Sequence, residues 1–211
     1  MNKFIKYSFC ALFILSVGIF SGCNNKTNKV QPKIDSVRVD SIKIDSIKKA
    51  NLIQDSINQC IVKELQCKFI NKVDEFTGTT WVIPKTAPKY RNINGTYCYF
   101  AKSESAAYNF RFVLQYAADD WLFIRHLYFN IDGHNLVFRN VAFDRDNNTK
   151  IWEWCDLAVE SPTLITMLEN AKTVKIKMEG LEYEEVRILN AKTLKSIQNT
   201  IKYYKALGGT F

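Results

Sequence analysis

Large apolar side chains alternate with polar ones between residues 108 and 138, a pattern typical of β-strands whose two faces meet different surroundings. Even positions carry the large side chains in the first segment: Tyr108, Phe110, Phe112, Leu114 and Tyr116. Odd positions carry most of them in the next segment: Trp121, Phe123, Leu127, Phe129 and Ile131. We therefore predict antiparallel strands joined by tight turns as the central element of the fold.

The turns determine which residues of these strands lie opposite each other. With residues 117–120 as the first turn, the predicted pairs are Tyr116–Trp121, Leu114–Phe123 and Phe110–Leu127. The second turn is Asp132-Gly133, which accepts the positive φ angles of a type I′ hairpin. It predicts the pairs Ile131–His134, Phe129–Leu136 and Leu127–Phe138. Arg125 then faces Phe112, so we expect it at a sheet edge or in a partly hydrated site.

The N-terminal third carries different periods. Apolar side chains recur every four residues at Ile53, Ile57, Ile61, Leu65, Phe69 and Val73. This spacing predicts an amphipathic helix over residues 49–76, whose first turn is expected near Ile47. Its apolar face includes Cys60 and is expected to pack on the domain or on another copy of the chain. Residues 34–48 instead repeat every five, which turns a helix by a net of about 140° and gives no apolar stripe. Residues 23–48 are therefore interpreted as a flexible tether, with a spacer or docking segment as the alternative.

Shorter patterns complete the prediction for a globular domain at residues 80–211. Strands are expected at residues 81–83, 97–100, 151–159, 174–178 and 181–188, the last with a bulge at Glu184-Glu185, where the apolar positions change parity. Ser161-Pro162 is typical of a helix start, and Asn190 is a suitable cap for the last helix. The predicted fold class is α+β: a mainly antiparallel sheet, as a sandwich or half-open barrel, with two short helices in the C-terminal half.

The first 22 residues differ from the rest of the chain. Lys3 and Lys6 precede an apolar run that ends at Ser21-Gly22-Cys23, too short and too abruptly ended for a membrane span. This pattern resembles a bacterial lipoprotein signal peptide with its lipobox. The resemblance implies cleavage before Cys23 and acylation of Cys23, which anchors the chain to a membrane. An ordinary secretory signal or an uncleaved anchor is the alternative.

A second resemblance concerns the compartment. Asn24, rather than aspartate, follows the cysteine, and by resemblance to the Gram-negative sorting pattern this favours the outer membrane, on either its periplasmic or its outward face. The formal charge of +8 falls to +6 without residues 1–22, because Lys3 and Lys6 leave with them. An anionic envelope polymer or a protein of the envelope suits that charge, although solubility explains it equally. Nucleic acid is not an expected partner, because no arginine-rich run occurs.

Cysteine spacing predicts neither a metal site nor any other cofactor. Cys60 and Cys67 are too far apart along a helix to bond, at about 10.5 Å of rise. Cys98 and Cys155 lie on predicted strands, where they either pair across a sheet or remain free thiols. No cysteine or histidine pair has metal-ligand spacing.

Several motifs together resemble a domain of uncharacterised bacterial lipoproteins and small envelope or phage-associated proteins. The residues that carry this resemblance are Ala118-Asp119-Asp120-Trp121-Leu122-Phe123-Ile124, Asp132-Gly133, Lys150-Ile151-Trp152-Glu153-Trp154, and Gly180 with Tyr183. The resemblance spans about residues 95–208. It implies a fold and supplies no catalytic residues.

Binding is a better prediction than catalysis. Trp152 and Trp154 share a strand face with Asp156, and such rings stack on sugars or grip peptides. Packing beneath a helix is the commoner role of such a pair. A second candidate surface on the central strands consists of Arg125, His126 and Tyr128, with a satisfied cluster of the interior or the sheet edge as the alternative.

The enzyme alternative is a hydrolase in which His126 acts with Asp119 or Asp120. It requires these side chains to converge in a cleft. The sequence contains no serine elbow, no Cys/His pair and no HExxH motif. We therefore predict a lipid-anchored envelope protein that binds a partner without catalysis.

Overall fold

The computed structural model describes residues 35–159 and 161–211, with side chains from Ser46 onward. The predicted signal peptide and Cys23 lie outside this range. The chain divides into two units, Met1–Asp45 and Ser46–Phe211. The elements in chain order are α1 (Asp35–Leu65), a short 3-10 turn (Gln66–Lys68), β1 (Phe69–Val73), β2 (Thr80–Pro84), β3 (Gly95–Lys102), β4 (Ala107–Ala118), β5 (His126–Ile131), β6 (His134–Phe138), β7 (Asp144–Asn147), β8 (Ile151–Ala158), α2 (Pro162–Glu169), β9 (Val174–Glu179), β10 (Glu184–Ile188) and α3 (Ala191–Ala206).

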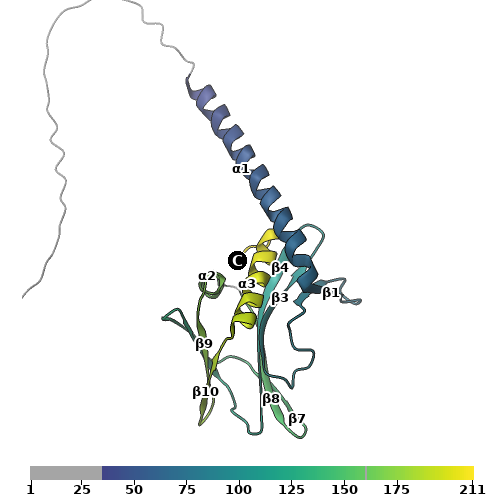
Figure 1. The fold of residues 1–211 in the computed structure, drawn as a ribbon, viewed down its shortest axis with the longest axis vertical. Coiled ribbons are helices and arrows are strands. Elements are labelled where there is room, and N and C mark those ends of the chain that lie inside the picture. The colour runs from purple at the N-terminus through teal and green to yellow at the C-terminus, as the bar shows by residue number, and fades with distance from the viewer. Residues whose placement is uncertain (1–34, 160) are drawn as a thin grey trace, which may run out of the picture. The chain divides into compact units, whose positions relative to one another are not determined.

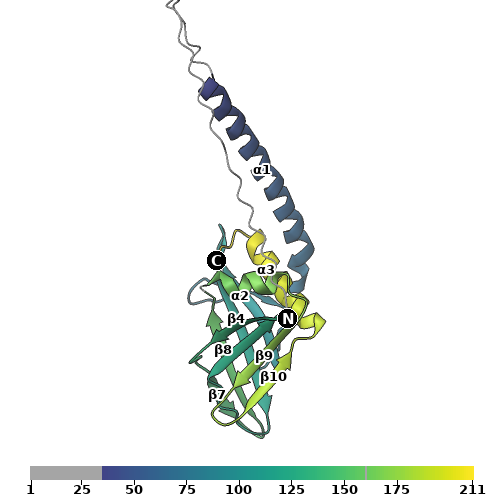
Figure 2. The same cartoon turned by 90° about the vertical axis from the view of Figure 1, so that its left-hand side faces the viewer.

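Two antiparallel sheets form the second unit. A six-stranded sheet, the larger sheet, has the order β1-β2-β3-β4-β8-β7, and a four-stranded sheet, the smaller sheet, has the order β10-β9-β5-β6. The sheets face each other, and α2 and α3 lie between them at one end (Figure 1; Figure 2 shows the same end turned by 90°). The predicted α+β class, mainly antiparallel with two helices in the C-terminal half, is confirmed. Of the two forms predicted, the structure is the sandwich, and neither sheet closes into a barrel within the described range.

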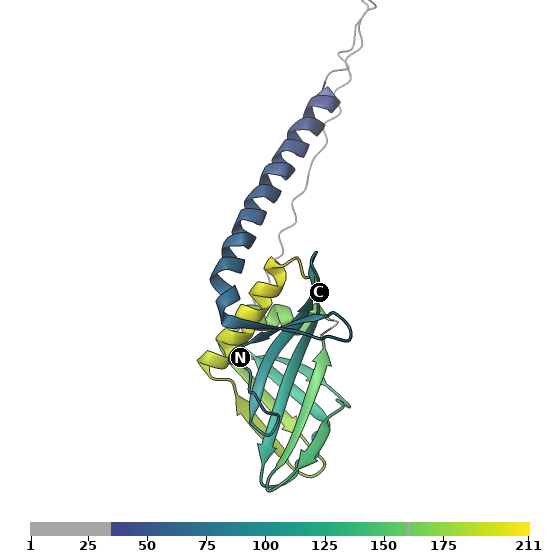
Figure 3. The ribbon, with the colours of Figure 1, turned by 90° about the vertical axis from the view of Figure 1, so that its right-hand side faces the viewer.

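The core fills the space between the inner faces of the sheets. Phe112 of β4 and Phe129 of β5 meet across this space with ring centroids 5.5 Å apart. Helix α3 closes the end, because Tyr204 contacts the rings of Phe100 and Phe110 at 5.3 and 5.1 Å. The helices therefore cover the inner side of the larger sheet, and its other side, turned to the viewer in Figure 3, is free of α2 and α3.

Local signals in the sequence predict the second hairpin and the helix starts correctly. β5 and β6 pair in the predicted register, and Asp132 and Gly133 have φ angles of 49° and 88°. The Ser161 side chain accepts a hydrogen bond from the Thr163 amide at the start of α2. Asn190 likewise caps α3. Each of these features depends on residues within a few positions of one another.

The predicted first hairpin is wrong. β4 pairs with β3 and β8, whereas β5 belongs to the other sheet, so Tyr116 lies opposite Glu153 and not opposite Trp121. Residues 121–125 form a crossover between the sheets instead of a strand. Phe123 has φ 55°, which breaks the extended chain. The buried row remains on even positions up to Ile124 and lies on odd positions from Leu127 onward. Arg125 is consequently exposed and does not face Phe112.

A buried carboxylate holds this crossover in place. The Glu153 side chain is 0% exposed and accepts hydrogen bonds from the amides of Leu122, Phe123 and Ile124 at 2.9, 2.7 and 2.9 Å. Arg145 donates to the same carboxylate from Nε at 2.9 Å and to the Ile124 carbonyl from Nη2 at 3.1 Å. A charged group buried in this way is stable only because every oxygen is paired.

Helix α1 differs from the prediction at both ends. It begins at Asp35, so the predicted flexible tether is helical from that residue on, and it ends at Leu65, before Phe69 and Val73 enter β1. β1 pairs with β2 over its whole length, and this pairing overrides the helical spacing of its apolar residues. No helix within the described residues is long and apolar enough to cross a membrane.

Within the part of α1 that belongs to the second unit, from Ser46 onward, the last turns contact the sandwich. Leu65 is fully buried, and Ile61 and Val62 pack against the core. Leu52, Ile53 and Ile57 are 70%, 53% and 47% exposed, and Cys60 is also exposed. The apolar face thus packs on the domain at its C-terminal end alone. Self-association through the remaining part stays a prediction.

The predicted bulge in the last strand is also wrong. β10 pairs with β9 in an unbroken register from Glu184 to Ile188. Leu181 and Tyr183 lie in the turn before β10, and within the strand Val186 and Ile188 point to solvent, at 54% and 66% exposure. Arg187 points inward instead and donates to the carbonyls of Gly95 and Gln115 at 3.2 and 2.8 Å, which ties the smaller sheet to the larger one.

The described cysteines are all free thiols. Cys98 lies on β3 and Cys155 on β8, and β4 runs between these strands, so no disulfide joins them. Burial raises the pKa of both thiols, that of Cys155 to about 12.

Candidate binding groove on the larger sheet

The outer face of the larger sheet carries an unusual set of side chains for a surface without a helix above it. Residues paired across strands share a face, and the pairings of β3, β4 and β8 place Tyr97 beside Val113 and Asp156. The next layer consists of Gly95, Gln115 and Trp154. Trp81 of β2 extends this face, with its ring centroid 5.3 Å from that of Tyr99.

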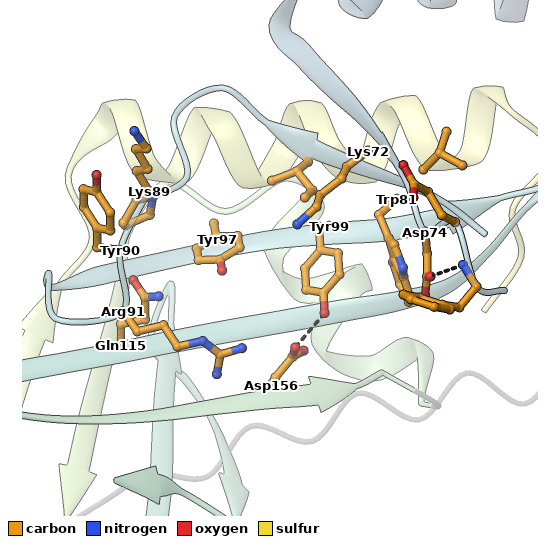
Figure 4. Close-up of a pocket in the computed structure, with 15 residues that line it drawn as sticks. Lys72, Asp74, Trp81, Lys89, Tyr90, Arg91, Tyr97, Tyr99, Gln115 and Asp156 are labelled. Carbon is orange, nitrogen blue, oxygen red and sulfur yellow. Dashed lines mark hydrogen bonds between the residues drawn. The ribbon is translucent and has the colours of Figure 1, made fainter. Parts of the chain in front are cut away.

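Of these residues, Trp81, Tyr97, Tyr99, Gln115 and Asp156 line a groove of about 710 Å³. The β1–β2 turn bounds one end, where Asp74 Oδ1 accepts a hydrogen bond from the Phe76 amide at 2.9 Å, and the loop between β2 and β3 bounds the other (Figure 4). Along the floor lie Trp81, Tyr97, Tyr99, Gln115 and Asp156, with Arg91 reaching in from the loop. The volume is within the usual range for small-ligand sites, roughly 300–1,000 Å³.

A hydrogen-bonded chain fixes the centre of the groove. The Tyr99 hydroxyl donates to Asp156 Oδ2 at 2.6 Å, and Arg111 Nε donates to Asp156 Oδ1 at 2.7 Å. Arg111 Nη2 also donates to the Asp156 carbonyl at 2.8 Å. Burial and the hydrogen bond to Asp156 raise the pKa of Tyr99 well above its ordinary value, so this hydroxyl stays protonated. The Tyr99 ring therefore has one defined position.

Two buried polar atoms at the groove have no protein partner. Within the described residues, Gln115 Oε1 and Trp154 Nε1 are the buried side-chain nitrogen or oxygen atoms that form no hydrogen bond. Gln115 is 2% exposed and lines the groove floor. Gly95 makes room for it, because a Cβ at this position would lie 2.9 Å from Gln115 Oε1 and 2.5 Å from the Pro88 ring. Unpaired buried polar groups cost stability, and they occur at sites that pair with a ligand or water.

The side chain of Arg91 covers the ring of Trp154, one of the predicted site residues. The Arg91 guanidinium carbon lies 4.7 Å from the centroid of the Trp154 ring, within the range of a cation–π contact. Arg91 makes no hydrogen bond or ion pair to any residue from Ser46 onward that the structure describes. Its donors are therefore directed at the groove without a protein acceptor.

The structure brings part of the first predicted surface together. Trp152 and Trp154 are half-buried on the outer face, so the alternative that they pack beneath a helix is wrong. Trp154 adjoins the groove through Gln115 and Arg91, and Asp156 lies in the groove itself. Trp152 lies one layer further along, opposite Ala117.

The second predicted surface lies on the other sheet. Tyr128 donates to Glu179 Oε2 at 2.7 Å, and His126 Nδ1 accepts from the Asn140 amide at 3.0 Å. Arg125 is exposed in the crossover before β5. These residues have local partners on the smaller sheet and contribute nothing to the groove.

The predicted hydrolase pair is not assembled. Asp119 is exposed at the end of β4 and pairs with Lys150 at 3.4 Å. In the described part of the chain, no hydrogen bond or ion pair joins His126 to Asp119 or Asp120. Among the same residues, no group of three or more histidine, cysteine or acidic side chains is placed to hold a metal ion.

The sequence does not reveal most of the groove residues, because they come from five strands, the β1–β2 turn and the β2–β3 loop. The alternation of Tyr97 and Tyr99 on β3 was the available signal, since it places two rings on one face. Trp81, Arg91 and Gln115 carry no such pattern. The chain matches no protein-family model, no curated protein and no solved structure.

Proposed function

We propose that this chain is a lipid-anchored protein of the cell envelope, in the outer membrane, whose sandwich domain binds an envelope polymer in the groove of the larger sheet without catalysing a reaction. The observation that carries the binding role is the combination of a fixed aromatic floor with the unpaired Oε1 of Gln115. A ligand that donates a hydrogen bond there recovers the free energy that the buried acceptor costs in the free protein.

The envelope location rests on the first 23 residues. Basic residues, an apolar run and Ser21-Gly22-Cys23 follow each other in the order of a lipoprotein signal. One acyl chain gives only weak membrane binding, and stable anchoring takes more than one chain or a second contact. A protein that is held at a membrane and that also binds a polymer combines two weak attachments into a strong one.

Labelling tests the anchor. The full-length chain is expressed in a Gram-negative host with labelled palmitate, beside Cys23→Ala. We expect label and outer-membrane fractionation for the wild-type chain, and an unlabelled, unprocessed product for the variant. Label that persists in Cys23→Ala, or a wild-type chain without label, would refute lipidation at this residue.

Co-sedimentation tests the groove. The full-length protein in detergent is centrifuged with purified peptidoglycan sacculi, which sediment and carry both glycan and peptide. We expect the wild-type chain in the pellet and Trp81→Ala largely in the supernatant, because Trp81 forms part of the aromatic floor. Tyr183→Ala is the matched control, since this ring is 71% exposed in the turn between β9 and β10, away from the larger sheet. Equal sedimentation of all variants, or no sedimentation of the wild type, would contradict the proposal.

A further inference from the structure

The groove offers more than a general binding surface, because its rings form a row. The centroids of Trp81 and Tyr99 are 5.3 Å apart and those of Tyr99 and Tyr97 are 6.2 Å apart. Tyr97 and Tyr99 lie two positions apart on β3, and Trp81 lies on the neighbouring strand β2, so the row of partly buried rings runs along β3 and steps across to β2 (Figure 4). Its spacing is comparable with the length of one pyranose residue, so successive rings suit successive sugars of a linear chain.

The polar groups define the edge of such a ligand. Gln115 Oε1 needs a hydrogen-bond donor, and Arg91 offers donors that need an acceptor. An amide group satisfies both demands, because its N–H donates and its carbonyl accepts. Arg91 and Gln115 line the same groove, and both adjoin Trp154, Arg91 by its cation–π contact and Gln115 as its register partner.

A peptide fits this site less well than a sugar chain. Peptides that bind sheets add a strand to a free edge, but β3 and β4 each have hydrogen-bonded neighbours on both sides. Peptide helices lie in apolar grooves, whereas Lys72, Asp74 and Arg91 line this one. Sugar rings have apolar faces that stack on aromatic side chains and polar edges that take hydrogen bonds.

We infer that the groove binds a linear glycan that carries N-acetylamino groups, with the sugar faces on Trp81, Tyr99 and Tyr97 and one acetamido group between Gln115 Oε1 and Arg91. This inference rests on the proposed function and narrows the ligand to the glycan part of an envelope polymer. It assigns the preference for N-acetylated sugars to Gln115. An acetamido N–H is expected to donate to its side-chain oxygen better than the hydroxyl of a plain sugar does.

Calorimetric titration of the full-length protein in detergent tests the assignment. The probes are a β-1,4-linked tetramer of N-acetylglucosamine, the glucose tetramer with the same linkage, and the peptide released from peptidoglycan. We expect the N-acetylated tetramer to bind most tightly. Trp81→Ala should weaken its binding roughly tenfold, through the loss of a stacking ring.

Gln115→Leu separates the acetamido contact from stacking. The change removes an acceptor that has no protein partner, so the fold keeps its hydrogen bonds. We expect binding of the N-acetylated tetramer to weaken about fivefold, and binding of the glucose tetramer to change little. Circular dichroism and the melting temperature of each variant confirm that it is folded.

The possible results distinguish this inference from the proposed function. Equal affinity for both tetramers, or binding of the peptide alone, would overturn the glycan assignment, while loss of sacculus binding in Trp81→Ala would still support the groove. Sacculus binding that no groove variant changes would overturn both. Selective binding of the N-acetylated tetramer that Gln115→Leu reduces supports both.

Discussion

Glu153 allows the sharpest test of the fold, because one carboxylate holds the crossover between the sheets. Its Oε1 accepts from the Leu122 and Phe123 amides, and its Oε2 accepts from the Ile124 amide and from Arg145 Nε. In Glu153→Gln, whichever way the side-chain amide is oriented, its NH₂ group meets two donors. The substitution therefore replaces two hydrogen bonds by two donor–donor contacts and leaves the guanidinium without its anionic partner.

The size of the effect follows from burial. Glu153 is 0% exposed and the Arg145 side chain 33% exposed, and removing one partner of a buried pair typically costs about 3–5 kcal/mol. We expect a loss of about 3–4 kcal/mol in the free energy of unfolding, toward the lower end because Arg145 reaches solvent. For a chain of this size, that loss lowers the melting temperature by roughly 6–15 °C.

Urea unfolding followed by tryptophan fluorescence measures this loss, with the slope of the transition compared between variants. Glu184→Gln is the matched control, since Glu184 is 56% exposed and pairs with Lys177 at the surface. Such surface pairs contribute less than about 1 kcal/mol. A Glu153→Gln variant that loses no more than the control would show that the crossover does not depend on this carboxylate.

Two further predictions concern other parts of the sandwich. Arg187→Met removes the hydrogen bonds to the Gln115 carbonyl and to Asn94 Oδ1, at 2.8 and 2.6 Å. We expect urea unfolding to show a loss of about 2–3 kcal/mol in the free energy of unfolding. No loss would mean that the sheets do not need this link. Burial, with Glu185 nearby, raises the pKa of Tyr116 to about 12 from 10.0. The folded state therefore holds the Tyr116 proton more tightly than the unfolded state does. The stability that this difference contributes is fully present below pH 10.0 and is lost as pH rises toward about 12. Tyr116→Phe should flatten this decline in unfolding curves measured across that range, and an unchanged slope would contradict the assignment.

The sequence predicts those parts of the fold whose causes are local. The Asp132-Gly133 hairpin and the Ser161 and Asn190 caps need only a few neighbouring residues, and each is present as predicted. The crossover at Phe123 has its cause about thirty positions away, in the carboxylate of Glu153. No reading of residues 116–127 alone reveals that acceptor, so the alternation there suggests a hairpin that does not form.

The binding groove shows the same limit. Trp154 and Asp156 are detectable because they alternate on one strand with a common face. Arg91 belongs to a loop, and Gln115 lies within a strand where nearly every neighbour is buried. Their roles follow from the strand order β2-β3-β4-β8. No local pattern in the sequence indicates this order, because it is set by packing between distant segments.

The positions of the four described cysteines allow the opening of the sandwich to be measured by thiol labelling. Cys60 and Cys67 are exposed and open to alkylating reagents, whereas Cys98 and Cys155 are buried with raised pKa values and react only when the sandwich opens. The buried thiols flank β4 on β3 and β8. Mass spectrometry of alkylated chains thus separates native surface labelling from labelling that records the parting of the central strands, without any engineered probe.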